Sequence, residues 1–289
     1  MIQDIFPHHL DNVFHPGRIP QENSLVICLS GREILAKEED GTVTLPSYGQ
    51  IVSSSADRSG ADVCTQENYV FLFSLDQKDC FWLRTEQFPE VEGFAPQNIR
   101  SLRDKKTEPK YLFFTIYTAQ QLIGWYRDNV FCGRCAARTV HSTTERALVC
   151  PSCGRVIYPR IVPAVIVGVT DGDRMVLTKY AGRDVPYFAL IAGFTEIGET
   201  LEETVAREVM EEVGLKVKNI RYYKSQPWGM ADDILMGFYC DVDGDRTIRL
   251  DRRELKEGAW YSRDEIVLQP DEYSLTNEMM MRFKDGLPC

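Results

Sequence analysis

Three glutamates are crowded onto one turn of an expected helix. The stretch GETLEETVAREVMEEVGL, residues 198–215, contains six glutamates, of which Glu208, Glu211 and Glu212 stand at positions i, i+3 and i+4. At this spacing side chains share one helix face with Cβ atoms about 5–6 Å apart, so their carboxylates repel one another. The repulsion is tolerated where solvent screens it or where a divalent cation lies among the oxygens. A solvated acidic face is the alternative interpretation, and the surrounding residues decide between the two.

Capping signals define the limits of this helix. Thr200 followed by Glu203 forms a capping box at its start, and Gly214 suits the left-handed conformation that ends a helix. The roughly 13 residues between them make a helix of common length. The arc next to the three glutamates carries small and apolar side chains, and we expect it to face the core: Ala206, Val209, Met210 and Val213.

Two Cys-x2-Cys pairs, separated by 14 residues, form the second chemical pattern. Each pair presents two thiolates to one ion, and two pairs complete a tetrahedron around zinc, with no open coordination position for catalysis. Gly133 in the first pair and Gly154 after the second allow the tight backbone turns of such a site. A redox-active pair is the alternative interpretation. The expected ligands of a structural Zn²⁺ are Cys132, Cys135, Cys150 and Cys153.

The composition is that of an ordinary globular protein. The chain has 289 residues, of which 44% are hydrophobic and 26% charged, and its net charge is −10. This charge argues against a broad nucleic-acid surface built from lysine and arginine, although a divalent metal would still permit a polyanionic substrate. Residues 1–20 lack the apolar segment of a signal peptide, and no stretch reaches the roughly 18 apolar residues of a membrane span.

The cysteine usage fits a reducing compartment. Without an export signal, the nine cysteines are expected to be thiols or metal ligands rather than disulfides, and the cytoplasm is the expected location. The five cysteines outside the two pairs are expected to be buried as small apolar residues: Cys28, Cys64, Cys80, Cys240 and Cys289.

The chain divides into regions of different pattern. Residues 1–118 alternate β-type runs with turns, and residues 24–45 and 69–85 each suggest a hairpin, whereas residues 118–129 have helical periodicity. This part carries no chemical motif, so a scaffold or a dimer surface is its expected role. Downstream, strands mixed with helices and long loops predict an α+β fold with a mixed sheet. The expected domains are a β-rich domain ending in a helix (1–130), a zinc ribbon (131–157) and a catalytic domain (158–289).

The acidic helix and the loop before it resemble the signature of the Nudix hydrolases. The segment GFTEIGETLEETVAREVMEEVGL, residues 193–215, has the form G-x5-E-x7-R-E-U-x-E-E-x-G-U, where U is aliphatic. The resemblance implies an α/β/α sandwich for residues 158–289, with the crowded glutamates as ligands of Mg²⁺ or Mn²⁺, which prefer oxygen donors. All nine fixed positions match: Gly193, Glu199, Arg207, Glu208, Val209, Glu211, Glu212, Gly214 and Leu215.

The same resemblance implies a role for each acidic residue of the signature. Glu208 and Glu212 would bind metal directly, while Glu211 would be a ligand through water or a general base. Metals between these carboxylates and a diphosphate would neutralise its charge and activate a water molecule. Glu199 would pair with Arg207 and hold the loop-helix-loop in shape. Which glutamate is the base stays open.

Further motifs resemble the NADH pyrophosphatase branch of this family. They are the cysteine quartet, YPRIVPAVIV at 158–167, and SQPW at 225–228. The branch implies cleavage of NAD(H) to nicotinamide mononucleotide and AMP, removal of NAD caps from RNA 5′ ends in some members, and a homodimer. The metal set implied by position is Glu208, Glu212, Glu254 and the backbone carbonyl of Ala192.

The branch also implies a set of substrate contacts. Considered alone, an exposed or buried aromatic residue of this kind is more often part of the core than a ligand. As stacking surfaces for a base or nicotinamide, however, aromatic side chains are chemically suitable. The implied contacts are Glu145, Tyr158, Phe194, Gln226, Pro227, Trp228, Asp233 and Thr276.

One loop departs from the pattern of the branch. The array S-Q-P-W-P-F-P-x-S is replaced by SQPWGMADD, with Gly229, Met230 and Ala231 in place of Pro, Phe and Pro, and Asp233 in place of Ser. We expect a looser loop, weaker stacking and a carboxylate that repels a diphosphate. Hydrolysis of another nucleoside diphosphate, such as ADP-ribose or FAD, is therefore an alternative function. A nucleotide sensor without catalysis is a third, although it has no need of all the glutamates.

Overall fold

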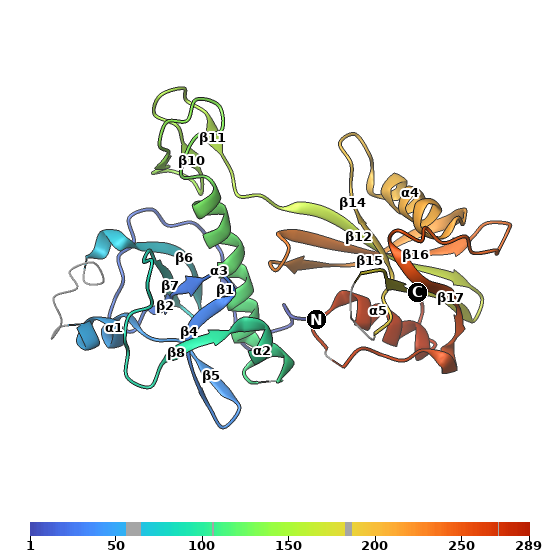
Figure 1. The fold of residues 1–289 in the computed structure, drawn as a ribbon, viewed down its shortest axis with the longest axis horizontal. Helices are drawn as coiled ribbons and strands as arrows, with labels where there is room; N and C mark the ends of the chain where they lie inside the picture. Colours follow the sequence, from blue (N-terminus) through green and yellow to red (C-terminus); the bar gives the residue numbers. More distant parts are fainter. Residues whose placement is uncertain (56–64, 106, 183–186, 271) are drawn as a thin grey trace. The chain divides into compact units, whose positions relative to one another are not determined.

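The computed structural model describes residues 1–55, 65–105, 107–182, 187–270 and 272–289 (Figure 1). Two compact units make up the chain. One comprises residues 1–3, 161–228 and 232–289, and the other residues 4–160 and 229–231. They are called the C-terminal unit and the N-terminal unit below. Among the described residues, no helix combines the length and apolar character needed to cross a membrane.

Two small sheets form the scaffold of the N-terminal unit. One has the order β1-β6-β7-β2, and in the other β3, β4 and β5 follow one another while β8 pairs with β4. Both predicted hairpins are confirmed, because β4 pairs antiparallel with β5 and β6 with β7. The strands are β1 (Leu10–Asp11), β2 (Leu25–Ile27), β3 (Leu29–Ser30), β4 (Glu33–Glu39), β5 (Thr42–Thr44), β6 (Tyr69–Leu75), β7 (Lys78–Leu83) and β8 (Ala95–Asn98).

The helix predicted at residues 118–129 starts earlier than expected. In the structure α3 spans Lys110–Asp128, with Pro109 at its N-cap. Its aromatic and β-branched first half favours a strand by composition, but Leu112, Phe113 and Ile116 are buried at helical spacing and extend the apolar face upstream. The other helices of this unit are α1 (Tyr48–Ser55), the short 3₁₀ helix η1 (Gln66–Asn68) and α2 (Ile99–Asp104).

The region with the cysteine pairs forms a small three-stranded sheet at the end of α3. Its order is β11-β10-β9, and both pairings are antiparallel. Its strands are only two residues long: β9 (Val140–His141), β10 (Leu148–Val149) and β11 (Val156–Ile157). Strands this short bury only a small hydrophobic core, so this region needs a bound metal ion to stabilise its fold.

The C-terminal unit is a mixed sheet with a helix on each face (Figure 1). The order is β15-β16-β12-β13-β17, β14 pairs with β12, and only the β12–β16 pairing is parallel. The predicted α+β sandwich with a mixed sheet is thereby confirmed. Its elements are β12 (Val162–Asp171), β13 (Arg174–Tyr180), β14 (Ile191–Phe194), α4 (Leu201–Val213), β15 (Val217–Trp228), β16 (Asp233–Val242), β17 (Leu255–Ser262), η2 (Arg263–Glu265) and α5 (Leu275–Lys284).

Alternate residues of β12 separate the two cores of this unit. Val165 and Val167 pack with the apolar side of α4, whereas Ile166 packs with Met279 and Phe283 of α5. Because successive side chains of a strand point to opposite faces, a run of apolar residues at 162–169 can serve both helices. The central strand is therefore buried on both sides.

Helix α4 presents a different face to the core from the one expected. Ala206 is exposed and Met210 is 41% exposed, whereas the buried valines are Val205, Val209 and Val213. Since residues three and four apart share a face, Glu208 and Glu212 lie among these valines rather than beside them. The expectation for Ala206 and Met210 was wrong because the glutamates were assigned to the solvent side of the helix.

Candidate active site and zinc centre

The ends of α4 are fixed by the capping residues predicted from the sequence. The backbone N–H of Glu203 donates to Thr200 Oγ1 at 3.2 Å, and the N–H of Thr200 donates to Glu203 Oε2 at 2.8 Å. Gly214 adopts the left-handed conformation at the other end, with φ 69°. These caps set which side chains of the helix face β14 and the sheet.

Glu208 packs directly onto the backbone of β14. It is 8% exposed, and a Cβ atom added at Gly193 would lie 2.0 Å from the Glu208 carboxyl carbon. No side chain fits in that space, so a residue without a Cβ is needed at position 193. The first glycine of the signature therefore makes room for the carboxylate, a reason that the sequence pattern alone did not give.

Glu212 is the most unusual carboxylate of the site. It is 1% exposed, and neither of its carboxylate oxygens has a hydrogen-bond partner among the described residues. Burial raises the pKa of Glu212 to about 8, and the charges of Glu208 and Glu254 add to this; the nearby backbone N–H of Ala192 opposes it without reaching hydrogen-bond geometry. An uncompensated buried carboxylate is costly, and a cation between the carboxylates would remove the cost.

Arg207 ties the loop before α4 to the helix. Its Nε donates to Glu199 Oε1 at 2.6 Å, and its Nη2 donates to the backbone oxygen of Phe194 at 2.9 Å. Hydrogen bonds from Arg207 lower the pKa of Glu199 to about 2. The same guanidinium also reaches Glu208 Oε1 at 2.7 Å and the exposed Glu211 Oε2 at 3.0 Å. Arg207 thus joins the loop, Glu199 and the two carboxylates.

Glu254 approaches the helix from a turn that is distant in the sequence. The N–H of Asp251 donates to the backbone oxygen of Glu212 at 3.0 Å, which fastens this turn to the end of α4. Glu254 itself is exposed, and its charge contributes to raising the pKa values of Glu208 and Glu212. Glu208 and Glu212 thus share a buried face of α4, and the charge of Glu254 acts on both, whereas the full metal set with the Ala192 carbonyl stays a prediction. Such a set of oxygen donors with orphaned buried oxygens fits a hard divalent cation.

The four paired cysteines converge on one point. Their sulfur atoms all lie within 4.8 Å of one another. The Cys132–Cys153 and Cys135–Cys150 sulfur distances are 3.7 and 3.4 Å, close to the roughly 3.8 Å expected around a tetrahedral Zn²⁺ with Zn–S bonds of about 2.3 Å. Backbone N–H groups, including that of Arg134, lower the pKa of Cys132 to about 6, which favours the thiolate needed for metal binding. The zinc centre is structural, because all four positions are filled by protein.

The two cysteine knuckles turn in the same way with different residues. The N–H of Ala136 donates to Cys132 O at 2.8 Å, and the N–H of Gly154 donates to Cys150 O at 2.9 Å. Ala136 has φ 59° and Gly154 has φ 72°, whereas Gly133 does not adopt a positive φ. The expectation that Gly133 provides the first turn was wrong, because the left-handed residue follows the second cysteine of each pair.

The unpaired cysteines are mostly buried, as expected. Cys28, Cys80 and Cys240 are buried, and burial raises the pKa of each thiol to about 12. Cys289 is only partly buried, which differs from the expectation. Cys64 lies outside the described residues.

Three of the expected substrate contacts have accessible side chains near the two metal centres. In the N-terminal unit, Tyr158 donates a hydrogen bond to Glu145 Oε1 at 3.2 Å, and both side chains are exposed. This hydrogen bond raises the pKa of Tyr158. In the C-terminal unit, Phe194 is 53% exposed at the end of β14, directly after Gly193. An exposed aromatic ring beside a carboxylate pair is a suitable surface for a planar group.

Gln226 lies in a buried hydrogen-bond network. It is fully buried; its amide nitrogen donates to Tyr273 O at 2.7 Å and to Gln3 Oε1 at 3.2 Å, and its oxygen accepts from Leu275 N at 2.7 Å. These hydrogen bonds hold β15 to the start of α5, and the expected substrate contact of Gln226 stays a prediction. Asp233 is also buried, at 7% exposure. Pro227 is exposed, and Trp228 and Thr276 are partly buried.

The loop that departs from the family pattern is held closely rather than loosely. A Cβ atom at Gly229 would lie 2.3 Å from the backbone oxygen of Tyr117 in α3, so only glycine permits this approach. Met230 Sδ accepts a hydrogen bond from Arg103 Nη1 at 3.3 Å. The expectation of a loosened loop was wrong, because the absence of a side chain at position 229 brings two backbone segments into contact.

Comparison with known proteins agrees with this geometry. Residues 127–158 match the NADH pyrophosphatase zinc ribbon domain, and residues 159–283 match the NUDIX domain. A protein of Erwinia tasmaniensis named NAD-capped RNA hydrolase NudC is 37% identical over 67% of this chain and 71% of its own length. Its namesake from Enterobacter sp. is 39% identical over 67% of this chain and 72% of its own length.

A solved structure is also similar in part. The Nudix hydrolase from Nitrosomonas europaea is 21% identical, with a TM-score of 0.47, and the match covers 55% of this chain and 94% of that one. With 37% identity over 71% of a relative, a matching zinc ribbon and a matching catalytic domain, this chain belongs to the Nudix hydrolases that carry the NADH pyrophosphatase zinc ribbon.

Proposed function

We propose that this protein hydrolyses the diphosphate bond of NAD(H) to nicotinamide mononucleotide and AMP, and that it also removes NAD caps from RNA 5′ ends. The observation that carries the proposal is the pair of buried carboxylates on α4, Glu208 and Glu212, with no partner for the oxygens of Glu212. The relatives named NAD-capped RNA hydrolases support the choice of substrate.

Glu208, Glu212, Glu254 and the carbonyl of Ala192 are the proposed ligands of Mg²⁺ or Mn²⁺. Bound there, the cation would neutralise the diphosphate and lower the pKa of an attacking water. Arg207 positions Glu208 through its 2.7 Å contact and holds the loop that ends at Glu199. With a cation bound to Glu208, Arg207 would keep its contacts with Glu199 and the backbone oxygen of Phe194.

Glu211 is the proposed proton acceptor for the attacking water. Its side chain is 59% exposed, and only Arg207 contacts its carboxylate among the described residues. An exposed carboxylate next to a metal site can accept a proton and release it to solvent. A role as a ligand through water uses the same position. Glu211→Gln distinguishes the two, because loss of a base lowers kcat, whereas loss of a ligand also weakens the dependence of rate on metal concentration.

Hydrolysis of ADP-ribose or FAD is the second candidate. The GMADD segment that follows Trp228 favours it, because a methionine replaces an aromatic residue expected in NADH pyrophosphatases. The substrate classes are separated by assaying NADH, NAD⁺, ADP-ribose and FAD side by side with Mg²⁺ or Mn²⁺, resolving products by chromatography. Preference for NADH or NAD⁺ with AMP as product supports the proposal. Preference for ADP-ribose or FAD overturns the substrate, and no cleavage at all indicates a sensor.

The remaining parts of the proposal concern assembly and location. A homodimer follows from the resemblance to NADH pyrophosphatases, and light scattering on the purified chain tests it. A cytoplasmic location fits the zinc centre, because thiolate ligands persist in a reducing compartment. The boundaries proposed for the β-rich domain, the ribbon and the hydrolase domain are 1–130, 131–157 and 158–289.

A further inference from the structure

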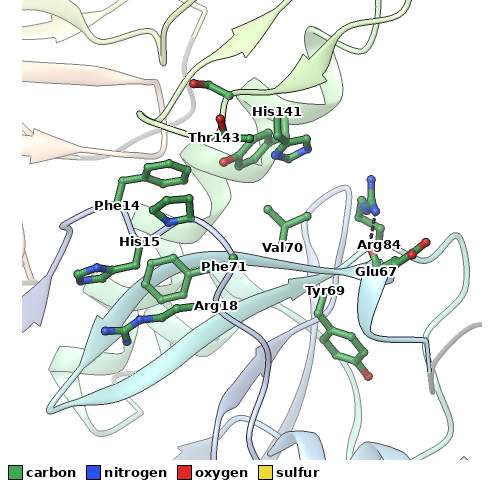
Figure 2. A pocket seen from close by; sticks show the side chains of 14 residues that line it. Phe14, His15, Arg18, Glu67, Tyr69, Val70, Phe71, Arg84, His141 and Thr143 are labelled. Carbon is green, nitrogen blue, oxygen red and sulfur yellow. Dashed lines mark hydrogen bonds between the residues drawn. The ribbon is translucent and has the colours of Figure 1, made fainter.

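A cavity of about 400 Å³ lies within the N-terminal unit, and none of its lining residues belongs to the Nudix signature or to the expected substrate contacts (Figure 2). The loop at residues 14–18, strand β6, helix α3 and the ribbon segment 141–143 contribute its walls. Ligand sites in proteins commonly have volumes of about 300–1,000 Å³. The cavity therefore has room for a small organic molecule, and the zinc ribbon forms one of its sides.

Aromatic rings line two sides of this cavity. Figure 2 shows Phe14 and Phe71 grouped on one side and His141 on the other, with Val70 between them. The ring of His141 stacks on that of Tyr126, with centroids 4.9 Å apart and planes 20° apart. Aromatic surfaces that enclose a space of this size suit a planar, stacking ligand such as a nucleobase.

Two arginines around the cavity have no carboxylate partner among the described residues. Arg84 lines the cavity and donates only to the backbone oxygen of Glu67. Arg146 lies outside the lining, with its guanidinium carbon 5.5 Å from the centre of the Phe14 ring; its Nη2 donates to Asn12 O at 3.2 Å and Asn12 Oδ1 at 3.3 Å, and it also interacts with Tyr126. In a chain of net charge −10, the guanidinium of Arg84, which lines the cavity and has no ion pair among the described residues, favours an anionic ligand, while the carboxylate of Glu67 lies in the same lining.

Arg84 and His141 of the ribbon segment line the same cavity. Burial lowers the pKa of His141, and the charge of Arg84 lowers it further. His141 therefore stays neutral and can stack without carrying a charge of its own near neutral pH. The remaining arginine of the lining, Arg18, is already paired with Asp79, so Arg84 is the cation that the cavity offers to a ligand.

From the rings and Arg84, we propose that this cavity binds a nucleotide unit, with its base between the aromatic walls and its phosphate beside Arg84. The inference is independent of the proposed function, because none of the lining residues belongs to the Nudix signature. The same chemistry is presented by free AMP and by a nucleotide within a single-stranded RNA. A nucleotide bound in this cavity would contact both the ribbon segment 141–143 and strand β6, and would thereby stabilise the packing of the ribbon against the sheet of the N-terminal unit.

Calorimetric titration of the full, zinc-loaded chain tests the proposal with two probes, 5′-AMP and a 5′-phosphorylated hexa-adenylate. The variant Arg84→Gln removes the charge at the cavity. Arg100→Gln is the matched control, since Arg100 is an exposed arginine of the same unit that lies outside the cavity. We expect the wild type to bind the probe. The Kd should rise at least about tenfold in Arg84→Gln and should be unchanged in Arg100→Gln and in Glu212→Gln.

The outcome identifies the source of the nucleotide. If AMP shows the Arg84-dependent event, the ligand is a free nucleotide; if only hexa-adenylate shows it, the ligand is RNA. A second variant, His141→Leu, removes a planar ring from the cavity lining and should weaken the same event. Melting curves of both variants check folding, and NADH hydrolysis should be unchanged in each. Wild-type binding of both probes by Arg84→Gln and His141→Leu would overturn the proposal.

Discussion

The two metal centres of this protein are built in opposite ways. At the zinc centre, four sulfur atoms from two short segments converge within 4.8 Å and fill every coordination position. At the acidic site, the buried carboxylates of Glu208 and Glu212 come from α4, the charge of Glu254 acts on both from the turn before β17, and the exposed Glu211 and Glu254 leave the site open to solvent. A closed set of ligands stabilises a fold, whereas an open set leaves room for substrate and water.

The pKa values of the ligands also differ between the two centres. Backbone N–H groups lower the pKa of Cys132 to about 6 and also lower that of Cys150, so the protein favours these two thiolates before metal binds, whereas burial and the neighbouring thiols raise the pKa of Cys153 to about 11. Burial raises the pKa of Glu212 to about 8, so the folded protein disfavours the ionised form of this carboxyl group until a cation binds. The zinc centre is therefore suited to bind its ion permanently. At the acidic site, the buried negative charge destabilises the fold, and metal binding would remove this destabilisation.

Loss of a zinc ligand should have the largest effect on stability. Replacement of the fully buried Cys150 by serine removes one thiolate, and structural zinc sites of this kind contribute about 10–16 kcal/mol of binding free energy in small peptides. We expect Cys150→Ser to lose its zinc and to melt far below the wild type. Atomic absorption and calorimetry measure the two effects.

Cys289→Ser serves as the control, because Cys289 is a partly buried cysteine outside the ribbon. It should keep one zinc per chain and the wild-type melting temperature. Full zinc content together with an unchanged melting temperature in Cys150→Ser would contradict the assignment of a closed zinc centre.

Loss of a carboxylate at the acidic site should abolish activity and leave the fold intact. Glu212→Gln keeps the shape of the side chain and removes the charge that would bind the cation. We expect kcat for NADH to fall by about 10³-fold, equivalent to about 4 kcal/mol in the barrier. Glu202→Gln changes an exposed glutamate of the same helix and should retain full activity. An unchanged rate in Glu212→Gln would exclude metal catalysis at this site.

The two centres also show how far sequence spacing can predict structure. The zinc ligands lie in two local knuckles, and the Nudix glutamates lie on one helix, so spacing alone brought each set together. The orientation of α4 could not be obtained in this way, because Met210 and Val209 are equally apolar and only the packing of β14 decides which is buried. The full burial of Gln226 likewise depends on Leu275 and Tyr273, which are distant in the sequence.

Local composition also misled where tertiary contacts dominate. Residues 110–117 are rich in aromatic and β-branched side chains, yet they form the first half of α3 because their buried positions follow a helical period. At position 229, glycine in place of proline suggested a more flexible loop. In the structure, however, the backbone of Tyr117 packs into the space that a side chain at position 229 would fill. Both errors have the same physical origin, a partner segment that a single sequence does not reveal.

The pH dependence of stability should separate the two centres without Mg²⁺ or Mn²⁺. A carboxyl group with a raised pKa in the folded state contributes no penalty below its ordinary value of 4.5, and its penalty grows as pH rises toward about 8. The wild type should therefore lose stability relative to Glu212→Gln between these pH values, by an amount on the order of a few kcal/mol. Denaturant unfolding at several pH values measures the difference.

Addition of Mg²⁺ at pH 8 should remove most of that difference, since the cation neutralises the ionised carboxylate. Glu202→Gln again provides the control and should follow the wild type at every pH. Parallel stability curves for the wild type and Glu212→Gln without divalent cations would show that Glu212 carries no stored cost, and the contrast between the two centres would then rest on exposure alone.

The smallest expected effect lies within the zinc centre, where the two knuckles differ at one equivalent position. Ala136 and Gly154 both have left-handed backbones, with φ of 59° and 72°, but only alanine carries a Cβ that this conformation strains by about 1–2 kcal/mol. Ala136→Gly relieves the strain and adds some freedom to the unfolded chain. We expect a net gain of about 0.5–1 kcal/mol in unfolding free energy and slower zinc release, whereas Gly154→Ala should lose a similar amount. A lower stability in Ala136→Gly would mean that the methyl group of Ala136 makes contacts worth more than its strain, and the two knuckles would then not be energetically equivalent.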